Sequence, residues 1–356
     1  MHQPPRQPDP RNQHLQQQPQ EQPKDLSQPS LALLNEQKRS WKLLAENLRS
    51  LQAAQTRTYE FETSLVAGAS ASREAHAAVR FVIRTQFNPS RLSSVSAKVD
   101  PASLGNRPCF LCADNRPDEQ LELACGDEFV LLCNPYPIFP EHFTIVHREH
   151  RPQHISDSFA AMLRLSQQLG RRYQVFYNGP RCGASAPDHM HFQAGDRGHM
   201  PIDAEYDRVK RPLFQCNGAS VFVDAGYLRR FISIESEDAD SVRACFAATY
   251  DAMKRLAGDE DEPMMNLIVA HERGTFRAVV FPRTRHRPSF YFADDQSRLL
   301  LSPGTVDLGG LVITPRRQDF DRLTAAHLVE MFQQVTVPPH AFAQLCDALK
   351  ERLASV

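Results

Sequence analysis

The sequence predicts an α+β protein in which antiparallel sheets carry packed helices and the arrangement is duplicated within the chain. Two observations lead to this fold class. Strand-like runs are separated by turns of the antiparallel type, and a pattern of strand, helix and strand occurs once in each half of the chain. The composition, with 41% hydrophobic and 23% charged residues in a chain of 356, is typical of a soluble globular protein of one large domain or two.

Composition also excludes several kinds of partner. A net charge of −1 gives no electrostatic reason to expect nucleic acid. No apolar run reaches transmembrane length and no signal peptide is recognisable, so we expect no membrane partner. Eight cysteines in 356 residues are too sparse for a disulfide framework, which favours a reducing, cytoplasmic setting. The oligomeric state is not indicated.

The N-terminal part divides into a tail and a helix. Residues 1–29 contain nine Gln and seven Pro, a composition that cannot bury apolar surface, so we expect them to be disordered. Residues 30–57 are expected to form an amphipathic helix that begins at the cap Ser30 and packs on the core, with partner binding as the minor alternative. Two larger units follow, over 58–215 and 216–356.

Each unit is expected to alternate strands with a helix. The first has predicted strands at 58–66, 77–88, 128–134, 143–146 and 173–177, and a helix over 159–172. The second has predicted strands at 220–224, 231–235, 265–270 and 275–282, and a helix over 238–256. A glycine-bearing loop with a short strand at 301–315 and two helices near 319–334 and 338–353 end the chain. The two units do not match residue by residue, so the duplication rests on the pattern alone.

Cys109 and Cys112 form a tight C-x-x-C pair. This spacing places two thiolates where one metal ion can bind both. A redox pair and two buried cysteines are the alternatives. Redox motifs normally open a helix, whereas the residues after Cys112 are typical of a loop, which weakens the redox interpretation.

His189, His191 and Gln193 occur at alternate positions of the run HMHFQ. In a strand they would line one face at steps of about 7 Å, while Met190 and Phe192 would enter an apolar layer on the other face. An imidazole is a nucleophile near neutral pH, and an amide beside it can donate a hydrogen bond to a phosphoryl oxygen. A polar face exposed to solvent is the alternative.

A loop of small residues precedes this strand. It contains Gly183, Ser185 and Pro187, and a backbone of this kind can approach a ligand closely. A small-residue loop followed by two imidazoles and an amide therefore predicts a site that handles phosphate.

Three segments resemble one branch of the histidine-triad superfamily, which contains hexose-1-phosphate uridylyltransferases, diadenosine tetraphosphate phosphorylases and GDP-L-galactose phosphorylases. Residues 109–115 (CFLCADN) are similar to the zinc-binding start of the uridylyltransferases. Residues 134–153 and 177–193 are similar to the Asn-led turn and the catalytic segment of the phosphorylases. The resemblance spans roughly 58–320. It implies a HIT-like fold, with 58–215 as the catalytic half and 216–356 as a second HIT-like half with C-terminal helices.

The resemblance also implies roles for individual residues. His191 matches the nucleophile that forms a nucleotidyl-histidine intermediate, and Gln193 matches the amide that steadies it. Ser185 and Gly183 match the loop that holds the leaving phosphate, and Asn178 belongs to the same segment.

A structural zinc ion is the cofactor that the resemblance implies. Its ligands would be Cys109, Cys112, His142 and His189, with His147 or His150 as replacements for His142. Two thiolates and two neutral imidazoles are a typical tetrahedral zinc set. No organic cofactor is implied, and a divalent cation could accompany the substrate phosphates.

Two arginines are further candidates for substrate binding. Arg181 could reach a phosphate as a planar, bidentate donor. Arg283 begins a cationic cluster that could bind phosphate or form a solvated loop. The chain departs from its relatives close to this region, because Cys182 stands where dinucleotide phosphorylases tend to have Ser and Asp188 is an extra residue before the first histidine.

The sequence therefore predicts an enzyme, a nucleotidyltransferase of the phosphorylase type. Its substrate would be a dinucleoside polyphosphate or a nucleoside diphosphate sugar, cleaved with phosphate as acceptor through a nucleotidyl-His191 intermediate. Nucleotidyl transfer to a hexose 1-phosphate is one alternative. A non-catalytic, zinc-stabilised nucleotide-binding protein is the other, and the intact His-x-His-x-Gln set speaks against it.

Overall fold

The computed structural model describes residues 24–62, 79–97, 99–105, 107–216, 218–224, 226–258, 261–294 and 296–353. Most of the predicted disordered tail lies outside these ranges. Its last residues are helical, because α1 (Ser27–Ser40) begins before the expected cap. Within the described ranges, no helix is both long and apolar enough to cross a membrane.

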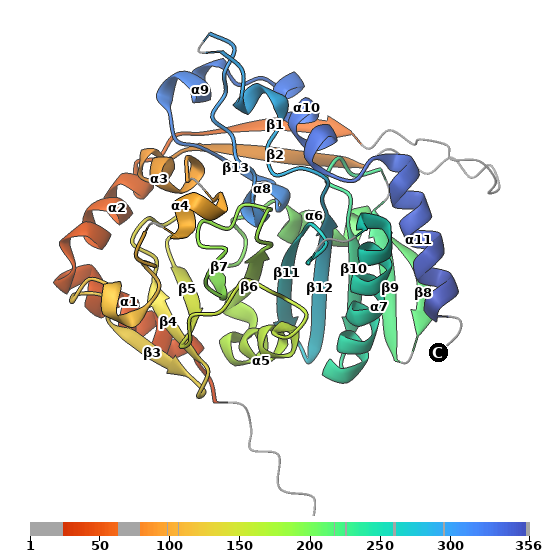
Figure 1. The fold of residues 1–356 in the computed structure, drawn as a ribbon, viewed down its shortest axis with the longest axis horizontal. Coiled ribbons are helices and arrows are strands. Elements are labelled where there is room, and N and C mark those ends of the chain that lie inside the picture. Colours follow the sequence, from red (N-terminus) through yellow and green to blue (C-terminus); the bar gives the residue numbers. More distant parts are fainter. Residues whose placement is uncertain are drawn as a thin grey trace, which may run out of the picture.

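A ten-stranded antiparallel sheet runs through the centre of the molecule (Figure 1). Its strand order is β3-β4-β5-β7-β6-β11-β12-β10-β9-β8. The bounds are β3 (Glu122–Cys125), β4 (Phe129–Cys133), β5 (His142–His147), β6 (Tyr173–Asn178), β7 (His191–Asp196), β8 (Lys210–Cys216), β9 (Ala219–Asp224), β10 (Ile232–Ser236), β11 (Met265–Glu272) and β12 (Thr275–Pro282).

The strand order confirms the predicted duplication. Followed inward from its two edges, the sheet has the order β3-β4-β5-β7-β6 and the order β8-β9-β10-β12-β11, which is the same topology twice. A helix lies at the same place in each half, α5 (Phe159–Leu169) between β5 and β6 and α7 (Ala239–Ala257) between β10 and β11. The halves join where β6 pairs with β11, with Asn178 opposite Asn266.

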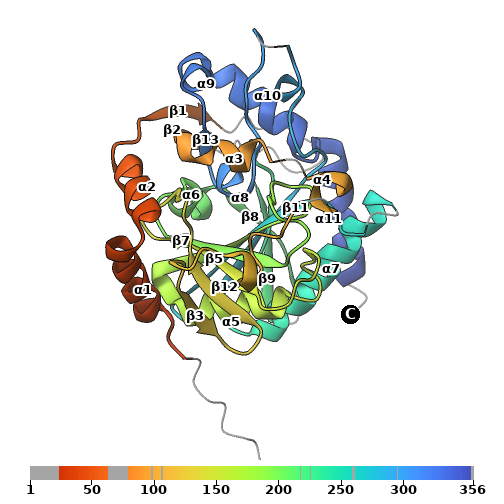
Figure 2. The ribbon, with the colours of Figure 1, turned by 60° about the vertical axis from the view of Figure 1, so that its left-hand side comes forward.

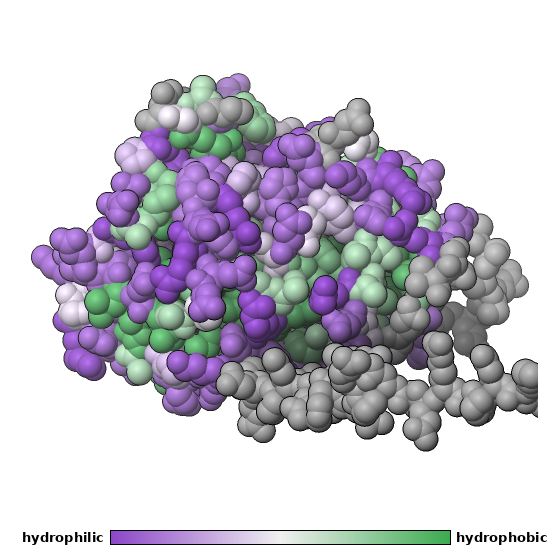
Figure 3. All heavy atoms as spheres, turned by 60° about the horizontal axis from the view of Figure 1, so that its bottom comes forward, coloured by the Kyte–Doolittle hydropathy of each residue, from purple (hydrophilic) through white to green (hydrophobic). Residues whose placement is uncertain are grey.

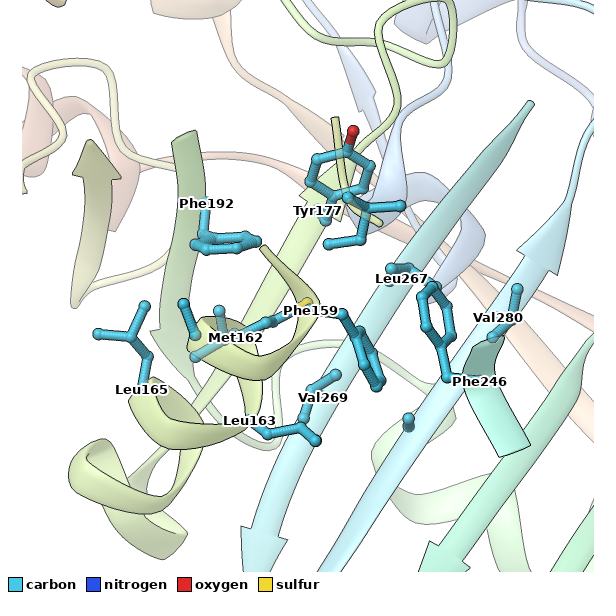
Figure 4. Packing of buried hydrophobic residues seen from close by; sticks show 14 of the residues in the cluster. Phe159, Met162, Leu163, Leu165, Tyr177, Phe192, Phe246, Leu267, Val269 and Val280 are labelled. Carbon is cyan, nitrogen blue, oxygen red and sulfur yellow. The ribbon is translucent and has the colours of Figure 1, made fainter. Parts of the chain in front are cut away.

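One face of the sheet is covered by helices and forms the larger apolar core. Phe159 of α5 and Phe246 of α7 stack with their ring centroids 3.7 Å apart above Leu267 and Val269 of β11 (Figure 4). The C-terminal α11 (Pro339–Leu353) packs on α7. On the β3 side, α1 and α2 (Lys42–Gln52) extend this core (Figure 2). The face of the molecule shown in Figure 3 is mostly hydrophilic, with smaller hydrophobic areas.

The other face carries a small second sheet of order β1-β2-β13. Here β1 (Thr56–Glu62) and β2 (Arg80–Phe87) form an antiparallel pair, and β13 (Leu311–Thr314) runs parallel to β2. This pairing, seen at the top of Figure 1, brings the segment before β13 next to the N-terminal strands. A second core lies beneath it and includes side chains from α6 (Ile202–Val209) and α8 (Thr305–Leu308).

Several predicted boundaries are wrong for identifiable reasons. The single helix over 30–57 is broken at Trp41, whose backbone is extended at ψ 101° while its indole is buried in the core, so packing outweighs helical continuity. The helix near 319–334 is divided into α9 (Arg317–Arg322) and α10 (Ala325–Val335), and Thr324 caps the second by accepting from the His327 N–H. The strand β8 was not predicted because it contains Pro212, which an edge strand tolerates.

Candidate functional site

The site begins where β6 and β7 separate. Their antiparallel ladder runs from the pair Tyr173–Asp196 to the pair Phe176–Gln193 and then stops. The loop of residues 179–190 occupies the space between the diverging ends. His191 is the first residue of β7 and is paired on its other side with Val146 of β5. The nucleophile candidate therefore lies on a strand that is supported by the sheet on one side only.

The side-chain amide of Gln153 fills the gap between the two strands. Its oxygen accepts from the backbone N–H of His191 at 2.8 Å. Its NH₂ group donates to the backbone carbonyls of His191 at 2.9 Å and Asn178 at 3.1 Å. Gln153 is buried, with an exposed fraction of 1%. The side-chain amide of Gln153 thus supplies the hydrogen bonds that the neighbouring strand does not make here, and it fixes the backbone at His191.

The imidazole of His191 is held in one tautomer. Its Nδ1 lies 2.8 Å from the carbonyl oxygen of His189, so Nδ1 carries the proton and donates. The lone pair therefore resides on Nε2, for which no hydrogen-bond partner exists in the described part of the chain. Burial lowers the pKa of His191 to about 4, so the ring is neutral near pH 7. A neutral imidazole with an open Nε2 can act as a nucleophile.

The amide of Gln193 is oriented by His142. The backbone N–H of Ile138 donates to His142 Nδ1 at 3.1 Å, which leaves the proton on Nε2. His142 Nε2 then donates to the amide oxygen of Gln193 at 2.9 Å. With its oxygen engaged, Gln193 presents its NH₂ group to the pocket that it lines. Such a group can donate to an anionic oxygen.

The pocket that Gln193 of β7 lines brings together several separate segments. These are the segment that begins at Arg91, the turn before β5, β6 with the loop after it, residues 286–287, the segment that contains α8, and β13. Its polar lining residues are Arg91, Ser94, Asn178, Gln193, His286, Arg287, Ser302, Thr305 and Asp307. The pocket therefore combines parts of both halves and of the small sheet.

The loop after β6 needs its glycines. A Cβ atom on Gly183, where φ is +98°, would lie 2.8 Å from the Cα of Gly304. Asn178 anchors the loop, because its side-chain oxygen accepts from Asn266 Nδ2 at 2.9 Å and from the Thr305 N–H at 2.8 Å. Asn178 and Gly183 both line the pocket, as a ligand-binding role requires.

Ser185 and Arg181 lie on the same loop but do not line the pocket. Ser185 is half-buried, and its carbonyl oxygen accepts from Arg107 Nη2 at 3.4 Å. Arg181 is exposed. Their predicted roles in binding phosphate would need the loop to change shape.

The prediction for Arg283 is wrong. All its donor nitrogens are used within the protein: Nε bonds to the Val335 carbonyl at 3.0 Å, Nη1 to Asn266 and Pro303, and Nη2 to the carbonyls of Arg285 and His286. The side chain is buried, with an exposed fraction of 4%. Arg283 is a structural clamp that holds β12 to the segment that carries α8, so it cannot bind a substrate.

A cluster of cysteine and histidine side chains could hold a metal ion. The ligand atoms of Cys109, Cys112, His150 and His189 all lie within 4.8 Å of one another. The Cys109 Sγ–His189 Nδ1 distance is 3.3 Å, and the Cys112 Sγ–His150 Nδ1 distance is 3.2 Å. In a tetrahedral zinc site with bonds of about 2.3 Å to sulfur and 2.0 Å to nitrogen, such ligand atoms are roughly 3.5 Å apart.

The outer contacts of these imidazoles also suit a metal. His189 Nε2 donates to the His147 carbonyl at 2.8 Å, which directs the lone pair of Nδ1 towards the thiols. His150 Nε2 lies 3.9 Å from the carboxylate of Asp188. The residues present therefore fit a metal bound by two sulfurs and two nitrogens.

His142 is not part of this cluster, so its predicted role as the fourth ligand is wrong. Both of its ring nitrogens are occupied, Nδ1 by the Ile138 N–H and Nε2 by Gln193. His150, one of the two replacements considered, supplies the fourth ligand atom instead. The error arose because His142 begins β5 and His150 follows it, and the sequence does not show which of the two approaches the cysteines.

Two family models match the chain, one over each half. Residues 33–196 match a domain of unknown function (DUF4922), and residues 205–356 match a family described as GDPGP1-like, C-terminal domain. A comparison with curated proteins returned no match.

Solved structures give the fold. Yeast Ap4A phosphorylase Apa2 in complex with AMP matches with a TM-score of 0.52 at 19% identity, over 86% of this chain and 97% of that chain. The same protein in complex with Ap4A has a TM-score of 0.51 at 19% identity, over 83% of this chain and 97% of that chain. A uridylyltransferase has a TM-score of 0.35 at 14% identity, over 70% of this chain and 93% of that chain, which is too low to argue a shared fold.

The protein is thus an α+β protein with the HIT-like fold of Ap4A phosphorylase. Its C-terminal part, residues 205–356, matches the GDPGP1-like family model, and its fold is similar to that of Ap4A phosphorylase. The resemblance seen in the sequence is confirmed at this level.

Replacing Gln153 tests its role as a bridge. In Gln153→Leu three buried backbone groups lose their partner, and we expect the free energy of unfolding to fall by about 3 kcal/mol in urea titrations. Gln167→Leu, at an exposed position of α5, is the matched control and should change it by less than about 0.5 kcal/mol. Equal stability of the two variants would contradict the bridging role.

Proposed function

We propose that the protein is a nucleotidyltransferase of the phosphorylase type that works through a nucleotidyl-His191 intermediate. The observation that carries the proposal is the tautomer of His191, whose Nδ1 proton is donated to the His189 carbonyl so that Nε2 keeps its lone pair. The HIT-like fold shared with a phosphorylase supports the same reading. Gln193 lines the pocket, and His191 lies two positions before it on the same face of β7, so a substrate phosphate bound there would lie beside the proposed nucleophile.

The reaction divides into two displacements. In the first, His191 Nε2 attacks the α-phosphorus, the N–P bond forms, and the bond to the leaving phosphate oxygen breaks with its electron pair. Gln193 donates from its NH₂ group to a phosphoryl oxygen as negative charge develops there. In the second, an oxygen of inorganic phosphate attacks the same phosphorus and the electron pair of the N–P bond returns to Nε2.

The substrate class follows from the relatives. The matched structures carry Ap4A and AMP, and the matched C-terminal family is described as GDPGP1-like. We therefore propose a dinucleoside polyphosphate or a nucleoside diphosphate sugar as substrate, with phosphate as acceptor. Transfer to a hexose 1-phosphate would use the same intermediate with a different second nucleophile.

We also propose that the cysteine and histidine cluster holds zinc. Zinc with four protein ligands supplies structural support and needs no contact with the substrate. His189 would bind the metal through Nδ1 while its backbone carbonyl accepts the Nδ1 proton of His191. The cluster would in this way fix the group that selects the tautomer of the nucleophile.

Covalent labelling tests the intermediate. The wild-type protein, mixed with α-labelled dinucleoside polyphosphates or nucleotide sugars and quenched, should carry acid-labile label on His191. His191→Asn should carry none, whereas His340→Asn, at an exposed position of α11, should label as the wild type does. Gln193→Ala should slow labelling by roughly 100-fold. Absence of label from the wild type with every candidate would remove the covalent mechanism, and comparison across bases and acceptors would identify the substrate.

Metal content tests the ligand set. By elemental mass spectrometry, the wild type should contain one zinc per chain, and Cys112→Ser and His150→Asn should lose most of it. His142→Asn should retain zinc yet slow the labelling of His191, because His142 orients Gln193 and does not join the cluster. Zinc lost from His142→Asn and kept in His150→Asn would reverse this assignment.

A further inference from the structure

Arg91 is a half-buried cation in the pocket with donors to spare. It ends the short helical turn Pro89–Arg91 and lines the pocket together with Gln193 and Gly183. Its Nη1 donates to the carbonyl oxygen of Tyr136 at 3.0 Å. Among the residues that the structure describes, the guanidinium of Arg91 has no other hydrogen bond and no carboxylate within ion-pair distance.

The nearest opposite charge does not satisfy this arginine. Asp307 also lines the pocket and is close enough to oppose the effect of burial on the pKa of Arg91, which burial lowers to about 10. The carboxylate of Asp307 is already bonded, however, to the backbone N–H groups of Gly304 at 2.8 Å and Ile313 at 3.0 Å. Arg91 therefore stays charged near pH 7 and lacks a direct partner. The uncommitted guanidinium nitrogens can therefore donate to an anion that enters the pocket.

The neighbouring arginines differ in this respect. Arg283 has used every donor nitrogen within the protein. Arg287 lines the pocket but binds Ser302 Oγ at 2.9 Å and the Ala97 carbonyl at 3.0 Å, and its guanidinium lies 4.2 Å from the centroid of the Tyr291 ring. These contacts hold the guanidinium of Arg287 against the wall of the pocket. Arg91, with Nε and Nη2 uncommitted, is the better placed of the three to take a ligand.

We propose that Arg91 binds the phosphate group next to the one that His191 attacks. In the first displacement this is the leaving phosphate, and in the second it is the incoming inorganic phosphate. The proposal rests on the proposed function and names the residue that recognises its acceptor. The planar guanidinium has free N–H groups on Nε and Nη2, which can donate to two phosphate oxygens. Its positive charge neutralises the negative charge that the leaving oxygen carries when the P–O bond breaks.

With Arg91 as the phosphate ligand, neither the exposed Arg181 nor Arg283, whose donors are all used, is needed to bind the substrate. Arg181 and Arg283 were the candidates from sequence, and neither lines the pocket. Arg91 lies in the segment that follows β2 and is tied to the turn before β5 through the Tyr136 carbonyl. Gly183 of the loop after β6 lines the same pocket.

The test measures phosphate binding directly. Inorganic phosphate is titrated calorimetrically into the full-length wild type and into Arg91→Met, Arg91→Lys and Arg80→Met. Arg80 is an exposed cation on β2 that pairs with Glu62, so its variant controls for the loss of one charge. We expect Arg91→Met to weaken phosphate binding roughly 10- to 100-fold, Arg91→Lys to weaken it less, and Arg80→Met to leave it unchanged.

The outcomes separate this inference from the proposed function. If the wild type forms labelled His191 and the KM for phosphate rises in Arg91→Met but not in Arg80→Met, the result supports both the covalent intermediate and the role of Arg91. If labelling occurs and phosphate binding and KM are equal in Arg91→Met and wild type, the role of Arg91 is overturned and the intermediate survives. If no label forms, the proposed function fails, and the phosphate titration still supports or overturns the anion site by itself. Should Arg91→Met fail to fold, Arg91→Lys carries the comparison.

Discussion

The hydrogen bonds of the Gln153 side-chain amide to the backbone are the constraint on which the site depends. The β6–β7 ladder ends at Phe176 and Gln193 so that a loop can enter, and this opening would leave the backbone of His191 without a partner on one side. Gln153 supplies both the donor and the acceptor that a neighbouring strand would provide. The sheet can therefore open at one point without losing its order, and the open point is where His191, the proposed nucleophile, lies.

The same reasoning explains why a duplicated fold carries one site of this kind. In the second half, the equivalent strands β11 and β12 stay paired to the end and turn through Arg273 and Gly274, both at positive φ. No loop enters there. The second half contributes instead to the first, because Asn266 of β11 and Thr305 of α8 hold the side chain of Asn178 at the root of the loop. The first half contains His191, the proposed nucleophile, and the second half supports the loop beside it.

Patterns local in sequence predicted much of this molecule. The two-residue alternation correctly placed Met190 and Phe192 in the apolar core opposite His191, and the repeated strand, helix and strand pattern predicted the duplicated sheet. The C-x-x-C pair indicated where a metal cluster lies. These features depend on neighbours along the chain, which the sequence displays.

Features that depend on contacts between distant segments could not be predicted. The choice of His150 over His142 depends on which histidine the 107–112 segment approaches. The donors of Arg283 are used within the protein, whereas Arg91 keeps uncommitted donors in the pocket, and the sequence shows neither. The bridging by Gln153 spans 38 positions along the chain to His191, and no local pattern marks it.

The central claim is that the fold presents His191 as the Nδ1–H tautomer, with Nε2 open to a phosphate. Multiple-bond ¹H–¹⁵N correlation spectra of the ¹⁵N-histidine-labelled protein, with His191 assigned by comparison with His191→Asn, report the protonation of each ring nitrogen directly. The account predicts that at neutral pH the proton of His191 resides on Nδ1 and that Nε2 is unprotonated. A proton on Nε2, or a doubly protonated ring at that pH, would contradict it.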